Sequence, residues 1–249
     1  MPSYLITGCS RGLGLALAIE LSKPGNVVIA TARGDRSPAL IDLIEKSEGR
    51  VKYVKLDVIS PASVEEAEKK VATLLEGKGL DVLINNAAVI NWMSTGIETM
   101  DDLDSTFHNN VTSVHIVTRT FLPLLSEGKE KKVVNMSTTV GSISMAPTYS
   151  IMAVPAYKVS KAALNMLTVQ YAQSYEKEGF TFLAISPGWL RTDLGGEAAD
   201  LDVQTGAKAV IEAFEKHGKE FSGKLLNIRV SGWEESKGLN QYDGKVCPF

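Results

Sequence analysis

Tyr157 and Lys161 stand four positions apart in the segment Tyr157-Lys158-Val159-Ser160-Lys161. On a helix this spacing places both side chains on one face, about one turn apart. A nearby ammonium group favours the ionised form of a phenol, so we expect Lys161 to lower the pKa of Tyr157 toward the range of a general acid or base. The same spacing also occurs by chance on ordinary helix faces, so other motifs must decide between the two interpretations.

A glycine-rich stretch near the start of the chain predicts a phosphate site. It follows an apolar run, precedes a helical pattern and reads Thr7-Gly8-Cys9-Ser10-Arg11-Gly12-Leu13-Gly14. Glycine permits a tight turn and close approach of the backbone, and the first N–H groups of the following helix face a bound phosphate. A strand, glycines and a helix in this order favour dinucleotide binding over a plain chain reversal.

Two arginines near this turn favour NADP(H) as the dinucleotide. The second predicted strand ends in Thr31-Ala32-Arg33, where dinucleotide-binding folds hold the ribose of the cofactor. Arg33 and Arg11 offer guanidinium groups to a ribose phosphate. If that strand extends two residues further, Asp35 instead binds the ribose of NAD; solvated side chains are the third interpretation.

Strand-like runs alternate with helical patterns along the chain, which is typical of repeated βαβ units around a buried parallel sheet. The clearest helical pattern covers Ser63 to Leu75. The predicted strands are Tyr4 to Thr7, Val27 to Ala32, Val51 to Leu56, Val82 to Asn85, Val133 to Met136, Phe180 to Ile185 and Leu225 to Val230. No linker or repeat interrupts the pattern, so we expect one domain over residues 1–249.

Composition excludes several classes of function. The chain has 249 residues, a net charge of −3 and scattered basic residues, which argues against a nucleic-acid surface. No apolar run is long enough to span a membrane, and Met1 to Thr7 has no charged leader. Cys9 and Cys247 form neither a metal spacing nor a disulfide framework. We therefore expect a cytoplasmic protein without metal, nucleic-acid or membrane partners.

Polar and small residues follow the third and fourth predicted strands. These residues are Asp57-Val58 and Asn85-Asn86-Ala87-Ala88. Open parallel sheets bind ligands at the carboxyl ends of their strands, so Asp57 could accept a hydrogen bond from an adenine amino group, or it could cap the following helix. The amides of Asn85 and Asn86 need backbone or ligand partners. The two alanines leave room for a ring.

Five motifs in order resemble the short-chain dehydrogenase/reductase family, and the match covers essentially the whole chain. They are Thr7-Gly8-x-x-x-Gly12-x-Gly14, Asn85-Asn86-Ala87-Ala88, Asn110-Val111, Tyr157-x-x-x-Lys161 and Pro187-Gly188. A finer resemblance is to the carbonyl reductase subgroup that includes the sniffer and C-factor proteins. It rests on the stretch from Pro187 to Gly196 and on the ending Tyr242 to Phe249.

The resemblance implies an α/β fold, a doubly wound Rossmann-type three-layer sandwich around a seven-stranded parallel sheet. It also implies that Tyr157 protonates a carbonyl oxygen, that Lys161 lowers the pKa of Tyr157 and binds the nicotinamide ribose, and that Asn110 holds a proton-relay water. The implied cofactor contacts are Gly8, Ser10, Arg11, Gly12, Leu13, Gly14, Arg33, Asp57, Val58, Asn86, Ala87, Ala88, Tyr157, Lys161, Pro187, Gly188, Leu190 and Thr192.

The hydroxyl that polarises the substrate departs from the family pattern. In Val134-Asn135-Met136-Ser137-Thr138-Thr139, the family's second serine is Thr138. A threonine hydroxyl donates the same hydrogen bond, although its β-branch restricts the rotamer. Adjacent strand residues point to opposite faces, so only one of Ser137 and Thr138 should face the substrate. We favour Thr138, with Ser137 as the alternative.

Apolar residues near the predicted site suggest the walls of a substrate pocket. The stretch from Ser142 to Pro155 contains prolines that prevent a regular helix, and a loop near residues 189–205 follows the sixth strand. The candidate wall residues are Trp92, Met93, Ile143, Met145, Met152 and Trp189. Core packing is an equally good interpretation for the aromatic and Met side chains among them.

These observations predict NADPH-dependent reduction of a ketone or aldehyde on a small apolar or aromatic substrate, with Tyr157 as proton donor. A cofactor-binding regulatory protein with little turnover and an NAD-dependent alcohol dehydrogenase are the alternatives. The resemblance also implies a homodimer or homotetramer, formed through predicted helices near Asp101 to Leu125 and Tyr157 to Glu176.

Overall fold

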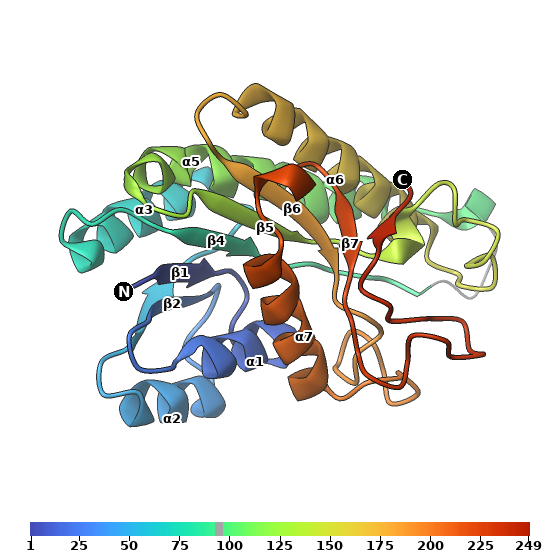
Figure 1. The fold of residues 1–249 in the computed structure, drawn as a ribbon, viewed down its shortest axis with the longest axis horizontal. Helices are drawn as coiled ribbons and strands as arrows, with labels where there is room; N and C mark the ends of the chain where they lie inside the picture. The colour runs from blue at the N-terminus through green and yellow to red at the C-terminus, as the bar shows by residue number, and fades with distance from the viewer. Residues whose placement is uncertain (93–96) are drawn as a thin grey trace.

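One mixed sheet forms the centre of the molecule. The computed structural model describes residues 1–92 and 97–249. Its sheet has eight strands in the order β3-β2-β1-β4-β5-β6-β7-β8 (Figure 1). The strands are β1 Ser3–Ile6, β2 Val27–Ala32, β3 Val51–Lys55, β4 Val82–Asn85, β5 Lys132–Met136, β6 Thr181–Ser186, β7 Leu225–Asn227 and β8 Val246–Cys247. Strands β1 to β7 run parallel, and β8 pairs antiparallel to β7.

The strand order reverses direction between β1 and β4, which confirms the doubly wound α/β prediction. At such a reversal the loops on either side leave the sheet in opposite directions, and a crevice opens at the carboxyl ends of the strands. The predicted count of seven strands is wrong by one. Strand β8 has only two residues, Val246 and Cys247, which is too short for a periodic pattern to reveal.

Helices cover both faces of the sheet (Figure 1). Helices α1, α2 and α7 lie on one face, and α3, α5 and α6 lie on the other. The helices are α1 Gly12–Leu21, α2 Pro38–Lys46, α3 Pro61–Leu75, α4 Leu103–Phe107, α5 Ser113–Glu127, α6 Pro155–Ser174 and α7 Val203–Lys216, with short 3₁₀ turns at Ile97–Thr99, Thr139–Gly141 and Lys219–Phe221.

Each helical layer buries its own apolar cluster against the sheet. Leu17 and Phe214 belong to the cluster under α1 and α7, and both are almost fully buried. Phe121 and Phe182 belong to the cluster under α3, α5 and α6. Burial of one such side chain contributes roughly 1.5–3 kcal/mol, so the two clusters hold the strand ends in fixed positions.

Local signals set the starts of the helices near the crevice. The Ser60 hydroxyl accepts a hydrogen bond from the backbone N–H of Ser63 ahead of α3, and Asp202 accepts one from Thr205 ahead of α7. Pro155 occupies the first turn of α6, where its missing N–H costs nothing. The helix predicted for Asp101 to Leu125 is divided in three, because a π turn at His108–Thr112 separates α4 from α5.

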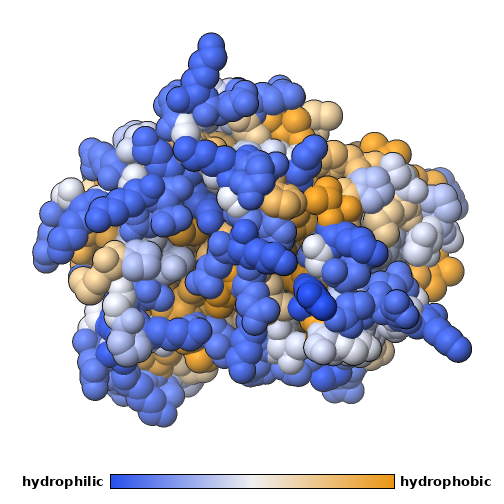
Figure 2. Space-filling model, in the orientation of Figure 1, coloured by the Kyte–Doolittle hydropathy of each residue, from blue (hydrophilic) through white to orange (hydrophobic). Residues whose placement is uncertain are grey.

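The last predicted strand is shorter than expected, since β7 ends at Asn227 and not at Val230. Beyond Asn227 the chain pairs with the C-terminal segment: the N–H of Val230 donates to the carbonyl of Tyr242, and that of Gly244 donates to Ile228. On the face drawn in Figure 2, hydrophilic side chains cover much of the surface and hydrophobic ones lie between them. Among the described residues, no helix combines the length and apolar character that crossing a membrane requires.

Candidate active site

A large cleft opens at the carboxyl ends of the parallel strands. Its volume is about 1020 Å³, and it extends from the glycine turn after β1 to the loops that follow β5, β6 and β7. This is the position at which doubly wound sheets bind ligands. Every predicted catalytic residue except Asn110, and every predicted cofactor-contacting residue, lines it.

The glycine turn takes the conformation that its sequence predicts. Gly8 and Gly12 have positive φ angles of 76° and 57°, which side-chain-bearing residues adopt rarely. Gly14 is required for a different reason: a Cβ at this position would lie 2.3 Å from the carbonyl oxygen of Gly8. Helix α1 can therefore start directly against the turn.

Asn86 holds the turn in place. Its side-chain amide donates to the carbonyl of Thr7 at 2.8 Å, and its backbone N–H donates to the Thr7 hydroxyl at 2.9 Å. The neighbouring Asn85 amide donates to Thr118 and to Asn135, both buried. Both amides thus have the protein partners that their position demands.

Charged residues lie at the end of the cleft formed by this turn. Arg11, Arg33, Asp35 and Asp57 all line it. The Asp57 carboxylate accepts from the N–H of Ile59 at 3.3 Å, and Ser60 caps α3 in its place. Arg11 forms an ion pair with Asp193, with 2.8 Å between Nε and Oδ2. Arg191 donates to the carbonyls of Ala199 and Asp200.

Tyr157 and Lys161 share one face of α6, as their spacing predicts. The Nζ of Lys161 lies 5.5 Å from the centre of the Tyr157 ring and donates to the carbonyl of Met136 at 2.7 Å. Burial lowers the pKa of Lys161 to about 7. Burial also raises the pKa of Tyr157, which is opposite to the direction expected from Lys161. Removing the Tyr157 phenolate from water costs more free energy than attraction to Lys161 returns, because a buried lysine is itself readily neutralised.

Ser137 and Thr138 face opposite sides, because the alternation of β5 continues past its end. The Ser137 hydroxyl is buried and donates to Oδ1 of Asn165 on α6 at 2.5 Å. Thr138 is half-buried, and its hydroxyl accepts from the N–H of Val140 at 3.2 Å. The Thr138 hydroxyl can still donate its own proton toward the cleft.

A close contact fixes the Thr138 hydroxyl relative to Tyr157 and Lys161. The 3₁₀ turn Thr139–Gly141 packs against α6, and a Cβ on Gly141 would lie 2.6 Å from the Cβ of Lys161 and 2.8 Å from its carbonyl carbon. The absence of a side chain at Gly141 therefore sets how near the end of β5 lies to the face of α6 that carries Tyr157 and Lys161.

Asn110 lies in the π turn between α4 and α5 and is fully buried. Its side chain accepts from the N–H of Val89 at 2.9 Å and donates to the carbonyl of Val89 and to the hydroxyl of Ser160. Ser160 in turn donates to the carbonyl of Tyr157 at 2.8 Å. Asn110 thus joins the wall after β4 to the first turns of α6.

The predicted substrate wall is only partly correct. Trp92, Met152 and Trp189 line the cleft. Ile143 is 76 % exposed and does not line it, and Met145 packs against buried residues that include Val140 and Ala184, so neither belongs to the wall. The Ser142 to Pro155 stretch folds outward at Ile143 and inward at Tyr149, which periodicity cannot reveal in a loop. Met93 lies outside the described residues.

A sequence model described as short chain dehydrogenase matches residues 3–202. The chain belongs to this family. A short-chain dehydrogenase/reductase named AacuF from Aspergillus aculeatus is 35 % identical over 229 residues, which are 87 % of this chain and 85 % of that protein.

Two solved structures also align with the whole chain. The NADPH-bound carbonyl reductase from chicken fatty liver is 29 % identical, with 94 % of that chain covered and a TM-score of 0.87. The carbonyl reductase Sniffer of D. melanogaster is 27 % identical, with full coverage and a TM-score of 0.86. The sniffer-like resemblance predicted from the two sequence stretches is therefore confirmed.

Several residues that the sequence did not identify also line the cleft. Tyr149 and the segment from Leu239 to Tyr242 line it. The Tyr242 hydroxyl donates to Asp200 at 2.5 Å and accepts from the N–H of Trp189 at 3.1 Å. The C-terminal ending carried the subgroup resemblance, but nothing in its pattern predicted that it would line the cleft.

Further hydrogen bonds connect these residues into one network. Asn240 donates to the Asp200 carboxylate at 2.7 Å. The Tyr149 hydroxyl lies 2.8 Å from the hydroxyl of Thr139 and 3.4 Å from Oδ1 of Asn240. The loops after β5, β6 and β7 therefore meet through side chains, and we call Tyr149, Trp189, Asp200, Asn240 and Tyr242 the wall network.

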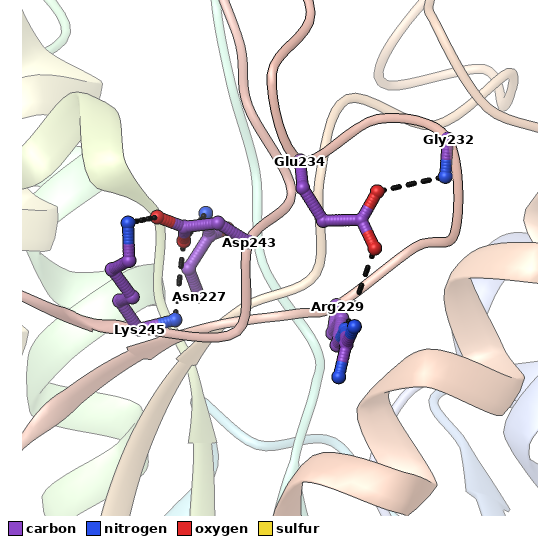
Figure 3. A network of polar contacts seen from close by, with 6 residues as sticks. All are labelled: Asn227, Arg229, Gly232, Glu234, Asp243 and Lys245. Atoms are coloured by element: carbon purple, nitrogen blue, oxygen red, sulfur yellow. Dashed lines mark hydrogen bonds and ion pairs between the residues drawn. The ribbon is translucent and has the colours of Figure 1, made fainter.

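The C-terminal segment is anchored to the end of β7 (Figure 3). The Asn227 amide donates to the carboxylate of Asp243 at 3.2 Å and to the carbonyl of Gln241 at 2.6 Å. Asp243 also pairs with Lys245, and Glu234 binds Arg229 and the N–H of Gly232. These contacts hold the chain segments before and after residues 239–242, and so they restrain the position of Asn240 and Tyr242 in the wall network.

Proposed function

We propose that this short chain dehydrogenase reduces the carbonyl group of a ketone or aldehyde with NADPH. The observation that carries the proposal is the cleft itself: Tyr157, Lys161 and Thr138 lie at one end, and a glycine turn flanked by Arg11 and Arg33 lies at the other. The NADPH-bound chicken carbonyl reductase, which has the same fold, supports the choice of cofactor and of reaction.

The residues at the glycine turn fit a dinucleotide. No side chain caps the start of α1, so the first N–H groups of the helix are available to a phosphate. Arg11 and Arg33 line the same part of the cleft and would hold the additional phosphate of NADP. Ala87 and Ala88 leave space for a ring. When bound, the nicotinamide supplies the hydride.

In the proposed mechanism, Tyr157 donates its phenolic proton to the carbonyl oxygen. The raised pKa keeps Tyr157 protonated at neutral pH, which suits an acid in the reductive direction. A developing alkoxide is a stronger base than a phenolate, so the transfer is favourable. Thr138 donates a hydrogen bond to the same oxygen and stabilises its developing charge.

Lys161 and Asn110 support this step. Lys161 is held by the carbonyl of Met136, and its ammonium form, which a pKa of about 7 populates at neutral and lower pH, offsets part of the charge of the phenolate left behind. Asn110 fixes the start of α6 through Ser160. We propose both roles from these contacts. The proton-relay water implied for Asn110 stays a prediction, as do the single domain, the oligomeric state and the cytoplasmic location.

We propose a neutral substrate with an apolar or aromatic group next to its carbonyl. Trp92, Val140, Met152, Trp189 and Leu239 line the cleft, and Val140, Met152 and Leu239 belong to one apolar cluster with Tyr157. Asp200, the carboxylate of the wall network, is already engaged by Tyr242 and Asn240. A charged substrate would lose its hydration there without gaining a matched partner.

The test is consumption of NADPH or NADH, followed by the absorbance of the reduced nicotinamide, with a panel of aromatic and aliphatic carbonyls. We expect turnover with NADPH and aromatic carbonyls. Binding of NADPH without turnover of any carbonyl would favour the cofactor-binding regulatory alternative, which the threonine at position 138 suggests. Equal use of NADH would contradict the role given to Arg11 and Arg33 and favour Asp35 as the ribose ligand.

A further inference from the structure

The ion pair between Arg11 and Asp193 joins two segments that line the cleft. Arg11 is the residue just before α1, inside the glycine turn, and Asp193 belongs to the loop after β6. Both line the cleft. The turn and the loop also approach each other beside this pair, since a Cβ on Gly12 would lie 3.6 Å from Cγ2 of Thr192. The pair therefore joins the two segments on either side of the expected cofactor.

The geometry of the pair leaves part of the guanidinium group for another anion. Asp193 contacts Nε, the inner nitrogen, at 2.8 Å. A guanidinium group carries five N–H donors in a rigid plane, and a carboxylate beside Nε leaves the outer edge, formed by the two amino groups, facing elsewhere. That outer edge is the one that grips a phosphate with two parallel hydrogen bonds.

The pair contributes little to folding by itself. The two side chains are 75 % and 77 % exposed, and exposed ion pairs stabilise proteins weakly because water and salt screen them. Its effect on ligand binding differs, because a long exposed arginine loses rotamer freedom when it grips a phosphate. A carboxylate that already holds the guanidinium plane reduces that loss.

We propose that Asp193 is a positioning residue that orients Arg11 toward a phosphate of the bound dinucleotide and so ties the loop after β6 to the cofactor. The inference rests on the proposed function, because it requires a dinucleotide in the cleft. Asp193 touches no reacting atom and acts through Arg11. A purely repulsive carboxylate beside a phosphate site would have the opposite effect, since its removal would tighten binding.

The experiment titrates the protein with NADPH, NADH and the fragment 2′,5′-ADP, and follows binding by nicotinamide fluorescence or calorimetry. Replacing Asp193→Asn should raise the Kd for NADPH and for 2′,5′-ADP about fivefold, the upper range for an exposed charge pair. The variant Asp193→Glu should recover most of the affinity. Glu66→Gln removes one carboxylate from a comparable exposed pair with Lys70 and should change nothing.

The NADH titration identifies which phosphate Arg11 meets. Loss of affinity for NADPH alone indicates the 2′-phosphate, and equal loss for NADH indicates the pyrophosphate; both support the role of Asp193. In an Arg11→Gln background, Asp193→Asn should have no further effect on the Kd. Unchanged or tighter binding in Asp193→Asn, or an equal loss in the Arg11→Gln background, would overturn the proposal. Failure of the wild-type protein to bind either dinucleotide would instead contradict the proposed function.

Discussion

The catalytic corner and the wall network differ in how their residues are held. The catalytic corner consists of Ser137 to Gly141 and the Tyr157 to Lys161 turn of α6. It is fixed by buried contacts, with Ser137 bonded to Asn165, Lys161 bonded to the carbonyl of Met136, and Gly141 against the α6 backbone. The wall network consists of residues on three loops: Tyr242 and Asn240 bond to Asp200, Tyr149 bonds to Asn240, and the backbone N–H of Trp189 donates to Tyr242.

On the proposed function, this difference should separate effects on the chemical step from effects on substrate selectivity. A change in the catalytic corner alters the position of the proton donor or the polarising hydroxyl, so it should act on kcat. A change in the wall network alters the shape of the cleft around the substrate, so it should act on KM and only for substrates that reach the wall. The variants below test this division.

Tyr157→Phe removes the proposed proton donor and should have the largest effect. Loss of a general acid costs on the order of 10²–10⁴ in rate, and we expect about 10³ in kcat. The Kd for NADPH should stay nearly unchanged, because the ring and the carbonyl bonded to Ser160 remain. Tyr175→Phe, on the outer part of the same helical layer, is the control. Retained activity in Tyr157→Phe would show that another group delivers the proton.

Thr138→Ala should lower kcat by about 10², as expected for loss of one donor to a developing oxyanion. Thr138→Ser should keep most of the activity. Ser137→Ala should instead lower stability by roughly 1–3 kcal/mol, because it leaves the buried Oδ1 of Asn165 without its donor. Measured kcat and urea unfolding separate the two sites, and a rate loss confined to Ser137→Ala would reverse the assignment.

Lys161→Met should change how stability depends on pH. The folded-state pKa of Lys161 is lowered to about 7, whereas an unfolded lysine titrates near 10.4. Between these values the unfolded chain binds a proton that the native protein does not, so Lys161 makes native stability rise with pH by about 1.4 kcal/mol per unit. Urea unfolding of Lys161→Met should lack this contribution, and Lys70→Met should retain it. If the free energy of unfolding changed with pH to the same extent in the wild type, Lys161→Met and Lys70→Met, the effect of burial on Lys161 would be refuted.

Gly141→Ala tests whether backbone contact sets the catalytic corner. The added Cβ has no room against Lys161, so the 3₁₀ turn must move away from α6. We expect kcat to fall about tenfold or more and stability to fall by about 1–3 kcal/mol. Gly238→Ala, whose Cβ would meet only an ordinary contact at 3.4 Å, should be neutral. An unchanged kcat in Gly141→Ala would mean that the corner tolerates displacement.

Asp200→Asn should have the smallest effect and the most selective one. It weakens the charge-assisted bonds from Tyr242 and Asn240 but keeps the shape of the side chain. We expect KM for bulky aromatic carbonyls to rise about fivefold, with kcat and the KM for a small aldehyde unchanged. Glu235→Gln is a matched surface control. A drop in kcat for every substrate would show that the wall network affects the chemical step, which would contradict the proposed separation of kcat and KM effects.

The sequence predicted the shared helix face of Tyr157 and Lys161 and the conformation of the glycine turn, because each is a local pattern. The spacing of Tyr157 and Lys161 required only a helix, and the glycine turn required only a strand before it and a helix after it. The choice of Thr138 over Ser137 came from the family pattern and stays a prediction; in the structure the Ser137 hydroxyl is bonded to Asn165 and the Thr138 hydroxyl accepts from the N–H of Val140. The direction of the Tyr157 pKa was wrong, because burial is not visible in a pattern of neighbours.

The residues of the substrate wall were predicted poorly, because the sequence pattern does not show which residues of a loop are buried. Ile143 and Met145 were chosen for their apolar character, yet one is exposed and the other packs into a separate core cluster. Tyr149, Asn240 and Tyr242 come from segments more than 90 positions apart, and only the pairing of the chain beyond β7 with the C-terminal segment brings them together. A loop has no period from which its inward residues can be read.

By itself the sequence determined the alternation of strands and helices around a parallel sheet, the glycine turn, and the helix that carries Tyr157 and Lys161. Local spacing and apolar periodicity are enough to specify each of these. The tertiary structure decided the pKa values of Tyr157 and Lys161, the partner of Arg11 and the composition of the wall network. Desolvation and contact between distant loops depend on the whole packed chain, and no stretch of sequence contains them.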